Sequence, residues 1–272
     1  MGSVRRRLRR LPAHVRPRRL HLYGVGHGKT GTTSLARMFA QYRSDHQLDN
    51  ARFVPITIAA LNGEVAAGLV RRELRRRSWR FHLEVDVASF LAPFAATLAG
   101  MYPDAKFVLT IRDCFSWLDS RVESHLHVPR ESVRYAYSEA QYGRYGEPFQ
   151  TEERSLRDAG LHPVASYLRY WAEINAYVLA AVPPDRLLVV RTEDLDASLE
   201  RIAEFAGVPA TTLSTARENA NPERTGLLGT VPRSYILAVA REHCAPLMQQ
   251  FWGPDWCDVI DRGAGPPTEG SR

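Results

Sequence analysis

The chain has 272 residues, 44% of them hydrophobic, and a formal net charge of +6 at neutral pH. This length supports one sizeable core or at most two small ones, and no apolar run approaches the length of a transmembrane segment. The three cysteines are an odd number without metal-ligand spacing, and the first residues lack the apolar stretch of a signal peptide, so we expect a cytoplasmic protein without a metal site.

The positive charge is concentrated at the N-terminus. Residues 1–19 hold eight arginines and no acidic residue, and removing them from the 36 basic residues leaves 28 against 30 acidic ones. The rest of the chain is therefore slightly acidic, and we expect no nucleic-acid surface on it. We predict a basic, disordered arm at 1–19, one domain at 20–260 and a disordered tail at 261–272. The arm is interpreted as a solvated leader, with contact to RNA or an anionic membrane as the alternative.

The first predicted strand, residues 20–25, leads into the glycine-rich sequence GHGKTGTTS and a helix predicted for 31–43. A strand, a glycine-rich loop and a helix in this order are typical of phosphate binding. The triphosphate motif GxxxxGK[ST] would need a glycine at position 23, which is Tyr23. The loop therefore predicts an anion site of another kind. Lys29 is one of two lysines beside 34 arginines, and its compact ammonium fits among phosphate oxygens.

In the next segments, the hydrophobic pattern defines the secondary structure in some cases and leaves it ambiguous in others. Residues 51–61 fit either a strand or a helix, and 64–77 are predicted to be helical. Residues 79–86 alternate between apolar and polar side chains, which predicts a strand with His82, Glu84 and Asp86 on its polar face. Apolar residues at helical spacing predict a helix at 88–100.

A second phosphate-binding pattern follows. Residues 106–111, KFVLTI, are typical of a central parallel strand. This strand ends in Arg112, and Ser120 lies eight residues later in a helix predicted for 114–126. An arginine at a strand end and a hydroxyl two turns into the next helix can bind one phosphate group. The later predictions are helices at 131–144 and 163–181, a strand at 186–191, a helix at 195–205, a loop at 217–230 and a helix at 234–250.

Strands alternating with helices predict an α/β fold, a single domain with a central parallel sheet flanked by helices. Ligands bind beyond the carboxyl ends of the strands in such sheets. We therefore expect the loop at 26–33, the strand end at Asp86 and the strand end at Arg112 to form one site.

The motif GKTGTTSL after one strand, with RDxxxWxxS after another, resembles the sulfotransferases that use 3'-phosphoadenosine 5'-phosphosulfate (PAPS). The resemblance covers roughly residues 20–252 and includes the later sequences VVRTEDL and FAGVP. It implies a sulfotransferase fold similar to that of P-loop NTPases. It also implies transfer of a sulfuryl group from PAPS to a hydroxyl or amine of a small-molecule, lipid or sugar acceptor. The product would be adenosine 3',5'-bisphosphate (PAP), with no metal involved.

The resemblance also implies roles for particular residues. Arg112 and Ser120 would bind the 3'-phosphate, and the loop that contains Arg224 would close over it. An aromatic residue contacts adenine in the cytosolic branch of the family, but Thr192 stands at that position here, so the chain is more similar to the bacterial and Golgi-like branches. The residues expected to bind the 5'-phosphosulfate are Gly28, Lys29, Thr30, Gly31, Thr32, Thr33 and Ser34.

Catalysis requires a group that neutralises the departing phosphate and a base for the acceptor hydroxyl. Lys29 is expected to perform the first role. Asp86 is the first candidate for the base, Glu84 the second and His82 the third. Asp86 has an alternative role as the cap of the following helix, and His27 is interpreted as a residue that packs the loop or faces the acceptor.

The acceptor pocket is expected between residues 121 and 170. Aromatic and histidine side chains there either line a pocket or pack helices together, and both interpretations stay open. They are His125, His127, Tyr135, Tyr137, Tyr142, Tyr145 and Phe149.

Two alternative functions remain. A small-molecule or nucleoside kinase is disfavoured by Tyr23 and by the cation, Arg112, directly before the acid that would hold magnesium. The other is a catalytically inactive relative that kept the fold. The arginine-rich, lysine-poor composition suggests a high-GC bacterium, where such enzymes modify secondary metabolites.

Overall fold

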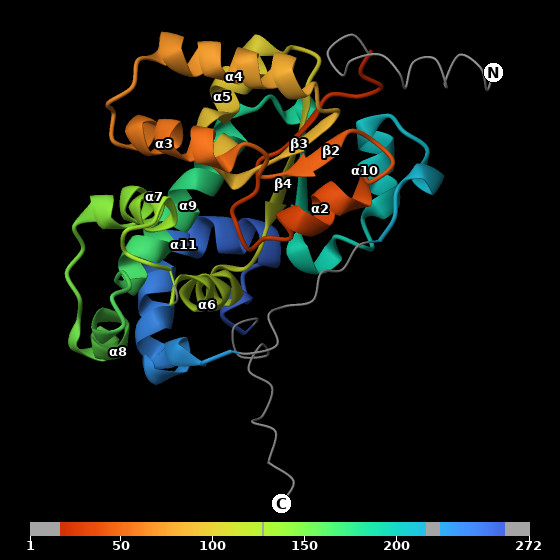
Figure 1. Ribbon diagram of the computed structural model, residues 1–272. Coiled ribbons are helices and arrows are strands. Elements are labelled where there is room, and N and C mark those ends of the chain that lie inside the picture. Colours follow the sequence, from red (N-terminus) through yellow and green to blue (C-terminus); the bar gives the residue numbers. More distant parts are fainter. Residues whose placement is uncertain (1–16, 127, 216–223, 259–272) are drawn as a thin grey trace, which may run out of the picture.

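Five short strands form one sheet at the centre of the molecule (Figure 1). This computed structural model describes residues 17–126, 128–215 and 224–258. The strands lie in the order β2-β3-β1-β4-β5, and all neighbours are parallel, so their carboxyl ends share one edge of the sheet. The strands are β1 (Leu22–Gly24), β2 (Ser44–His46), β3 (Val85–Val87), β4 (Lys106–Ile111) and β5 (Leu187–Arg191).

The sheet is buried on both faces. In β4, Phe107, Leu109 and Ile111 pack into one hydrophobic cluster, whereas Val108 packs into the other. Successive side chains of a strand point to opposite faces, so a nearly continuous apolar run belongs in a central strand covered on both sides. The predicted α/β single domain with a central parallel sheet is confirmed.

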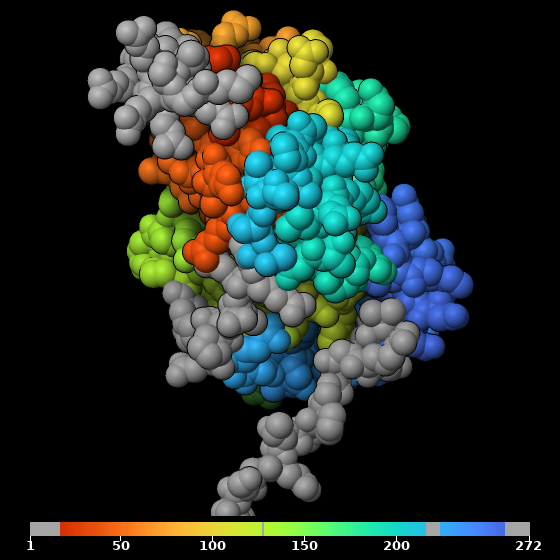
Figure 2. Space-filling view, turned by 90° about the vertical axis from the view of Figure 1, so that its right-hand side faces the viewer, coloured from red at the N-terminus to blue at the C-terminus, as the bar shows by residue number. Residues whose placement is uncertain are grey.

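One face is covered by α2 (Thr32–Met38) and α10 (Leu199–Ala206). Figure 2 views the molecule from this side, where the red and orange segment that contains α2 lies beside the cyan segment that contains α10. Leu35 and Phe39 from the first segment and Ile202 from α10 are fully buried against the sheet. Because the glycine-rich loop connects β1 to α2, the packing of α2 on the sheet keeps this loop at the carboxyl edge of the sheet.

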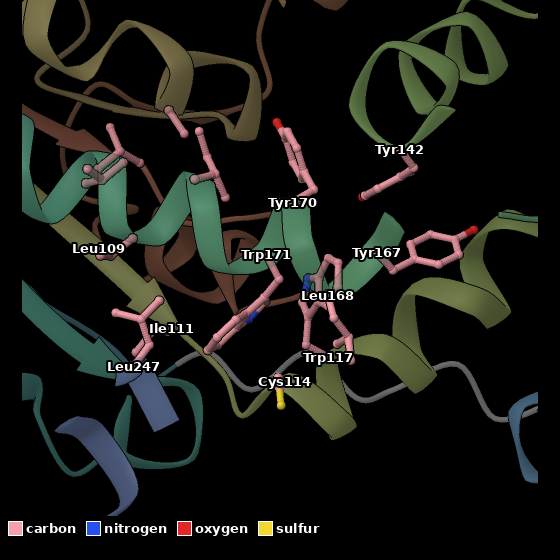
Figure 3. Close-up of a cluster of buried hydrophobic side chains, with 14 of the residues drawn as sticks. Leu109, Ile111, Cys114, Trp117, Tyr142, Tyr167, Leu168, Tyr170, Trp171 and Leu247 are labelled. Atoms are coloured by element: carbon pink, nitrogen blue, oxygen red, sulfur yellow. The ribbon is translucent and has the colours of Figure 1, made fainter. Parts of the chain in front are cut away.

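The larger cluster covers the other face. Figure 3 shows side chains from β4, α6, α9 and α11 converging in it, with Trp117 of α6 and Trp171 of α9 fully buried. No helix in the described ranges has the length and apolarity needed to cross a bilayer. The remaining helices are α3 (Asn50–Leu61), α4 (Ala67–Phe81), α5 (Ala95–Met101), α6 (Cys114–His125), α7 (Val133–Gln141), α8 (Arg154–Asp158), α9 (Val164–Ala181) and α11 (Arg233–Trp252).

The strand predicted for residues 79–86 is wrong over most of its length. Helix α4 continues to Phe81, His82 ends it at a φ of 47°, and the strand begins only at Val85. Trp79, which the alternation placed in the core, leaves 63% of its surface exposed. Arg77 instead turns inward, where its guanidinium contacts the rings of Phe53 and Phe90 and pairs with a carboxylate.

Two further boundaries differ from the predictions. The helix expected at 31–43 ends at Met38, and the polar residues 44–46 form the edge strand β2, which was not predicted. Residues 51–61, which fitted either structure, belong to α3. An edge strand needs no apolar pattern, because only one of its neighbours is another strand.

The described part of the predicted arm contacts the domain. Arg18 donates hydrogen bonds to the carbonyl of Leu83 and to Ser78, and Arg19 pairs with Glu84. Residues 1–16 and the tail predicted at 261–272 lie outside the described residues, so the arm and tail remain predictions.

Candidate functional site

The segments that follow all five strands line a single pocket of about 860 Å³. This is the expected position for a ligand in a parallel α/β sheet. Helices α6 and α7 and the C-terminal end of α11 complete the wall. Each strand is followed by at least one residue that lines the pocket. In the order β1 to β5, these residues are Lys29, Gln47, Ser89, Arg112 and Thr192.

The glycine-rich loop follows β1 and needs its glycines. A Cβ atom on Gly26 would lie 2.0 Å from the Thr110 hydroxyl of β4, and one on Gly28 would lie 2.6 Å from the Arg121 guanidinium. Gly31 has a φ of 83°, a conformation that glycine adopts without strain. Lys29 adopts a φ of 76° without being a glycine, which is uncommon and is often associated with function.

Thr30 faces the protein interior and does not line the pocket. Its hydroxyl donates to the His27 carbonyl at 2.6 Å and lies 2.9 Å from the Thr110 hydroxyl. Thr192 fixes the loop from the other side, because its hydroxyl donates to the carbonyl of Thr30 at 2.9 Å and to that of Ile111 at 3.1 Å. Thr30 therefore stays a predicted donor-binding residue only through its backbone, because its hydroxyl holds the loop to β4.

Two side chains of helix α6 form hydrogen bonds with the glycine-rich loop. The Trp117 indole and the Arg121 guanidinium donate hydrogen bonds to the carbonyl of Gly28 at 3.0 and 2.7 Å. His27 is buried between the rings of Trp117 and Tyr170, and Arg121 donates to its Nδ1 at 3.0 Å. Burial and the charge of Arg121 hold the pKa of His27 well below its usual value. His27 thus packs the loop, one of the two roles expected for it.

Lys29 lies in a strongly cationic environment. Burial lowers the pKa of its ammonium, and the charges of Arg121, Arg134, Arg224 and Arg112 lower it further. Among the described residues, no carboxylate forms an ion pair with Lys29 or Arg112. Several cations that face one pocket are suited to a polyanionic ligand.

The second predicted element lies across the pocket from the loop. Arg112, at the end of β4, has a pKa lowered mainly by burial. Arg224 reaches the same region, where it pairs with Asp119 at 2.8 Å. The segment after Arg224 is held by Glu123, whose carboxylate accepts hydrogen bonds from the backbone of Thr225 at 3.0 Å and from its hydroxyl at 2.9 Å.

Nine of the ten predicted donor-binding residues therefore line this pocket, and Thr30 is the exception. Lys29, the predicted catalytic cation, is among the nine. The lining residues are Gly28, Lys29, Gly31, Thr32, Thr33, Ser34, Arg112, Ser120 and Arg224.

None of the three predicted bases lines the pocket. Asp86 is buried in a bidentate pair with Arg77, at 2.6 and 2.9 Å. Glu84 is buried at the start of β3, where it accepts hydrogen bonds from Arg19 and from the backbone of Arg43. The expectation that these side chains reach the pocket is corrected, because His82 and Glu84 precede the strand and Asp86, within it, is turned towards Arg77.

A histidine that the sequence analysis did not single out does line the pocket. His46 ends the edge strand β2, and its Nε2 lies 3.1 Å from the Thr32 hydroxyl. Its Nδ1 lies 3.4 Å from the Thr33 hydroxyl. The sequence carried one available signal, a histidine a short distance after a phosphate-binding loop and helix, but the three polar residues of β2 gave no strand pattern.

Some of the aromatic and histidine residues expected near the acceptor line the pocket, whereas others pack helices together. His125 and Tyr137 line the pocket, whereas Tyr142 is fully buried and packs against Tyr167 (Figure 3). Tyr145 bonds to Glu173 on α9, and His127 lies outside the described residues. Trp252, another aromatic residue that was not predicted, lines the pocket from the end of α11, and its indole donates to Glu193 at 2.8 Å.

The cysteines and other potential ligands add no metal centre in the described ranges. Cys114, Cys244 and Cys257 are free thiols. Within the same ranges, no group of three or more histidine, cysteine or acidic side chains is arranged to hold a metal ion.

Solved structures similar to this chain include a sulfotransferase from Alicyclobacillus acidocaldarius, with 18% identity, a TM-score of 0.46 and coverage of 84% of this chain and 95% of that one. The sulfotransferase domain from the curacin biosynthetic pathway matches with 15% identity, a TM-score of 0.41 and coverage of 83% and 98%. The sulfotransferase domain of the Synechococcus PCC 7002 olefin synthase matches with 12% identity, a TM-score of 0.38 and coverage of 91% and 95%.

No curated protein matches the sequence. The family described as "Sulfotransferase domain" matches residues 22–223, a range that contains the glycine-rich loop and the segment from Arg112 to Ser120. The chain therefore belongs to the sulfotransferase domain family, and this membership implies PAPS-dependent sulfotransferase activity.

Proposed function

We propose that the protein transfers the sulfuryl group of PAPS to a hydroxyl of a small-molecule, lipid or sugar acceptor in the cytoplasm, as a step in secondary metabolism. The observation that carries the proposal is the pocket at the sheet edge, where Lys29 and Arg112 face the ligand space and form no ion pair with a carboxylate of the described residues. Charges left unpaired in a partly buried site are costly unless a ligand of opposite sign binds there.

The donor would bind across the whole sheet edge. In this proposal the loop from Gly28 to Ser34 holds the 5'-phosphosulfate, and Arg112 with Ser120 holds the 3'-phosphate. Arg224 would add a second cation beside that phosphate, supported by Asp119. The indole of Trp252 offers a flat surface for adenine, in place of the aromatic side chain that Thr192 does not supply.

Lys29 and His46 would perform the chemistry. PAPS supplies a sulfuryl group whose bond to the 5'-phosphate breaks as a bond to the acceptor oxygen forms. The Lys29 ammonium is placed to neutralise the charge that develops on the departing phosphate, as fixed cations do in phosphoryl transfer. His46 is placed to take the proton of the acceptor hydroxyl at one imidazole nitrogen.

The threonines next to His46 fit this role. Thr32 and Thr33 belong to the loop that would hold the phosphosulfate, and their hydroxyls lie within 3.4 Å of the imidazole. A hydroxyl can donate one hydrogen bond and accept another. Either threonine can therefore turn its proton towards the bound anion while its oxygen accepts a hydrogen bond from the imidazole.

The two alternatives predict different behaviour. A kinase would bind ATP with magnesium, but Tyr23 stands where the triphosphate motif needs its first glycine and is buried in β1. An inactive relative would bind PAP without turnover. Ligand preference and turnover together separate these outcomes from the proposed function.

The test is calorimetric titration of the protein with PAP. We expect binding at micromolar concentration, and Arg112→Ala should weaken it at least about tenfold, because a charge-assisted hydrogen bond is lost. Arg169→Ala is the matched control, since Arg169 pairs with Glu147 and Glu173 away from the pocket. Binding of magnesium ATP in preference to PAP, or no binding of PAP by the wild type, would contradict the proposal.

A further inference from the structure

One cationic side chain of the pocket has no role in the proposed function. Four acidic side chains line the pocket, and the protein itself engages all of them. Asp113 accepts a hydrogen bond from the backbone of Ser116, Glu123 from the segment after Arg224, and Glu193 from the indole of Trp252. Asp196, the fourth, also has a partner. Five cationic side chains face the same space. They are Lys29, Arg112, Arg121, Arg134 and Arg224.

Four of these cations already have roles. In the proposed function, Lys29, Arg112 and Arg224 hold the two phosphate-bearing ends of the donor. Arg121 is bonded to the carbonyl of Gly28 and to His27, so it supports the glycine-rich loop. Arg134 is left over.

Arg134 lies on the acceptor side of the pocket. It belongs to the first turn of α7, is exposed, and makes no ion pair with a carboxylate within the described ranges. Its charge nevertheless acts in the pocket, because it contributes to the lowered pKa values of both Lys29 and His125. An uncompensated guanidinium at a pocket wall is suited to a carboxylate or another oxyanion.

Arg134 shares its side of the pocket with three packed elements. Helix α7 packs against α3, and α3 packs against the segment after β3. These elements place aliphatic and aromatic side chains in the pocket, together with the polar side chains of Asn50, Ser89 and Gln141. Such a lining favours a hydrophobic ligand body with a few polar groups at fixed positions. The apolar residues are Val54, Phe90, Val128, Val133 and Tyr137.

We propose that the acceptor is an amphipathic hydroxy acid: its hydroxyl approaches His46, its hydrophobic body contacts this apolar wall, and its anionic group binds Arg134. This inference rests on the proposed function and narrows its acceptor class. Arg134 is then a specificity-determining residue that discriminates against neutral and cationic alcohols, because these would leave its guanidinium without a partner.

The test measures binding of matched acceptors to the protein saturated with PAP. The probes are para-hydroxyphenylacetate and ω-hydroxydecanoate, each compared by calorimetry with its neutral methyl ester. The acid of at least one pair should bind at least about tenfold more tightly than its ester, as expected for a charge-assisted contact. Arg134→Gln should abolish this difference while leaving the affinity for PAP unchanged.

A variant with a negative charge in place of Arg134 provides a second test. Arg134→Glu should prefer tyramine, the amine counterpart of the phenolic probe, over para-hydroxyphenylacetate. Arg130→Ala is the control, because Arg130 is exposed just before α7 but does not line this pocket. It should keep the preference of the wild type for the acid.

The outcomes separate this inference from the function on which it rests. Equal binding of acids and esters, a preference that survives in Arg134→Gln, or no binding of any acid to the PAP complex would each overturn the anionic acceptor. Loss of PAP affinity in Arg134→Gln would assign this arginine to the donor instead. Failure of the wild type to bind PAP would overturn the proposed function itself.

Discussion

At the scale of single residues, the proposed chemistry depends on His46. Replacing it with alanine removes the imidazole that would accept the proton of the acceptor, and loss of a general base typically slows catalysis about 10²–10⁴-fold. We therefore expect His46→Ala to lower kcat by this amount and to change the affinity for PAP by much less. Turnover of a sulfated product from radiolabelled PAPS, with PAP titration in parallel, measures both quantities.

The control distinguishes this base from those that the sequence suggested. His243→Ala removes a histidine of α11 that does not line the pocket, so it should keep full activity. Asp86→Asn, measured below its unfolding temperature, should retain turnover, because Asp86 is engaged by Arg77. Loss of kcat in Asp86→Asn with activity retained in His46→Ala would reverse the assignment.

Residues whose position follows from a local motif could be predicted from the sequence. Lys29 and Arg112 each stand at a fixed distance from a recognisable strand, and both line the pocket. His46 and Arg134 could not be predicted, because they reach the pocket from an edge strand and from a helix without such motifs. Thr30 shows a third case, in which the motif fixed the backbone but not the direction of the side chain.

At the scale of elements, a buried ion pair joins α4 to β3. Arg77 and Asp86 are both nearly inaccessible to solvent, and Arg77 also donates to the carbonyl of Leu48. Breaking such a pair leaves a buried charge without compensation and costs about 3–5 kcal/mol. We expect Arg77→Met to lower the free energy of unfolding by this amount in urea titrations.

Two further variants identify the cause. Arg77→Met combined with Asp86→Leu removes both charges and should recover most of the lost stability, since apolar replacements of buried pairs are often neutral. Arg80→Met changes an exposed arginine of the same helix and should have little effect. An effect of Arg77→Met no larger than that of Arg80→Met would contradict the structural role of the pair.

This ion pair also explains why the element itself was predicted wrongly. The alternation of residues 79–86 fits a strand, but Arg77, five residues before His82, lies in α4, and from there its buried side chain pairs with Asp86 of β3. A salt bridge between two elements is a tertiary interaction, which a local pattern does not contain. In contrast, β4 was predicted correctly, because its apolar run is itself the signal of a strand buried on both faces.

At the scale of the whole molecule, the pocket is assembled from segments far apart in the chain. The proposed donor half is built from two local motifs on neighbouring central strands, β1 and β4. The proposed acceptor half combines β2, α3, α7 and the segment after β3, which meet only when the sheet has formed. The fold class and the residues of the two motifs were therefore accessible to sequence reasoning, whereas on the other side only His125 and Tyr137 were predicted among the lining residues.

The fold also buries several histidines in their neutral form, which links the stability of the molecule to pH. Burial is the main cause that lowers the pKa in each case, to about 3 for His21. In the unfolded chain a histidine takes up its proton near pH 6.5. Between that value and the folded-state pKa, the unfolded state binds more protons, so stability is lost as the pH falls. The four residues are His21, His27, His125 and His162.

We therefore expect the free energy of unfolding to be steady above about pH 7 and to decrease below about pH 6.5. Each histidine that is protonated only in the unfolded chain contributes a slope of about 1.4 kcal/mol per pH unit. Urea titrations between pH 7.5 and 5 measure the total slope, and His21→Asn should reduce it by about one such contribution. A free energy of unfolding that stays constant over this range would show that these histidines gain protons in the native protein, which their burial opposes.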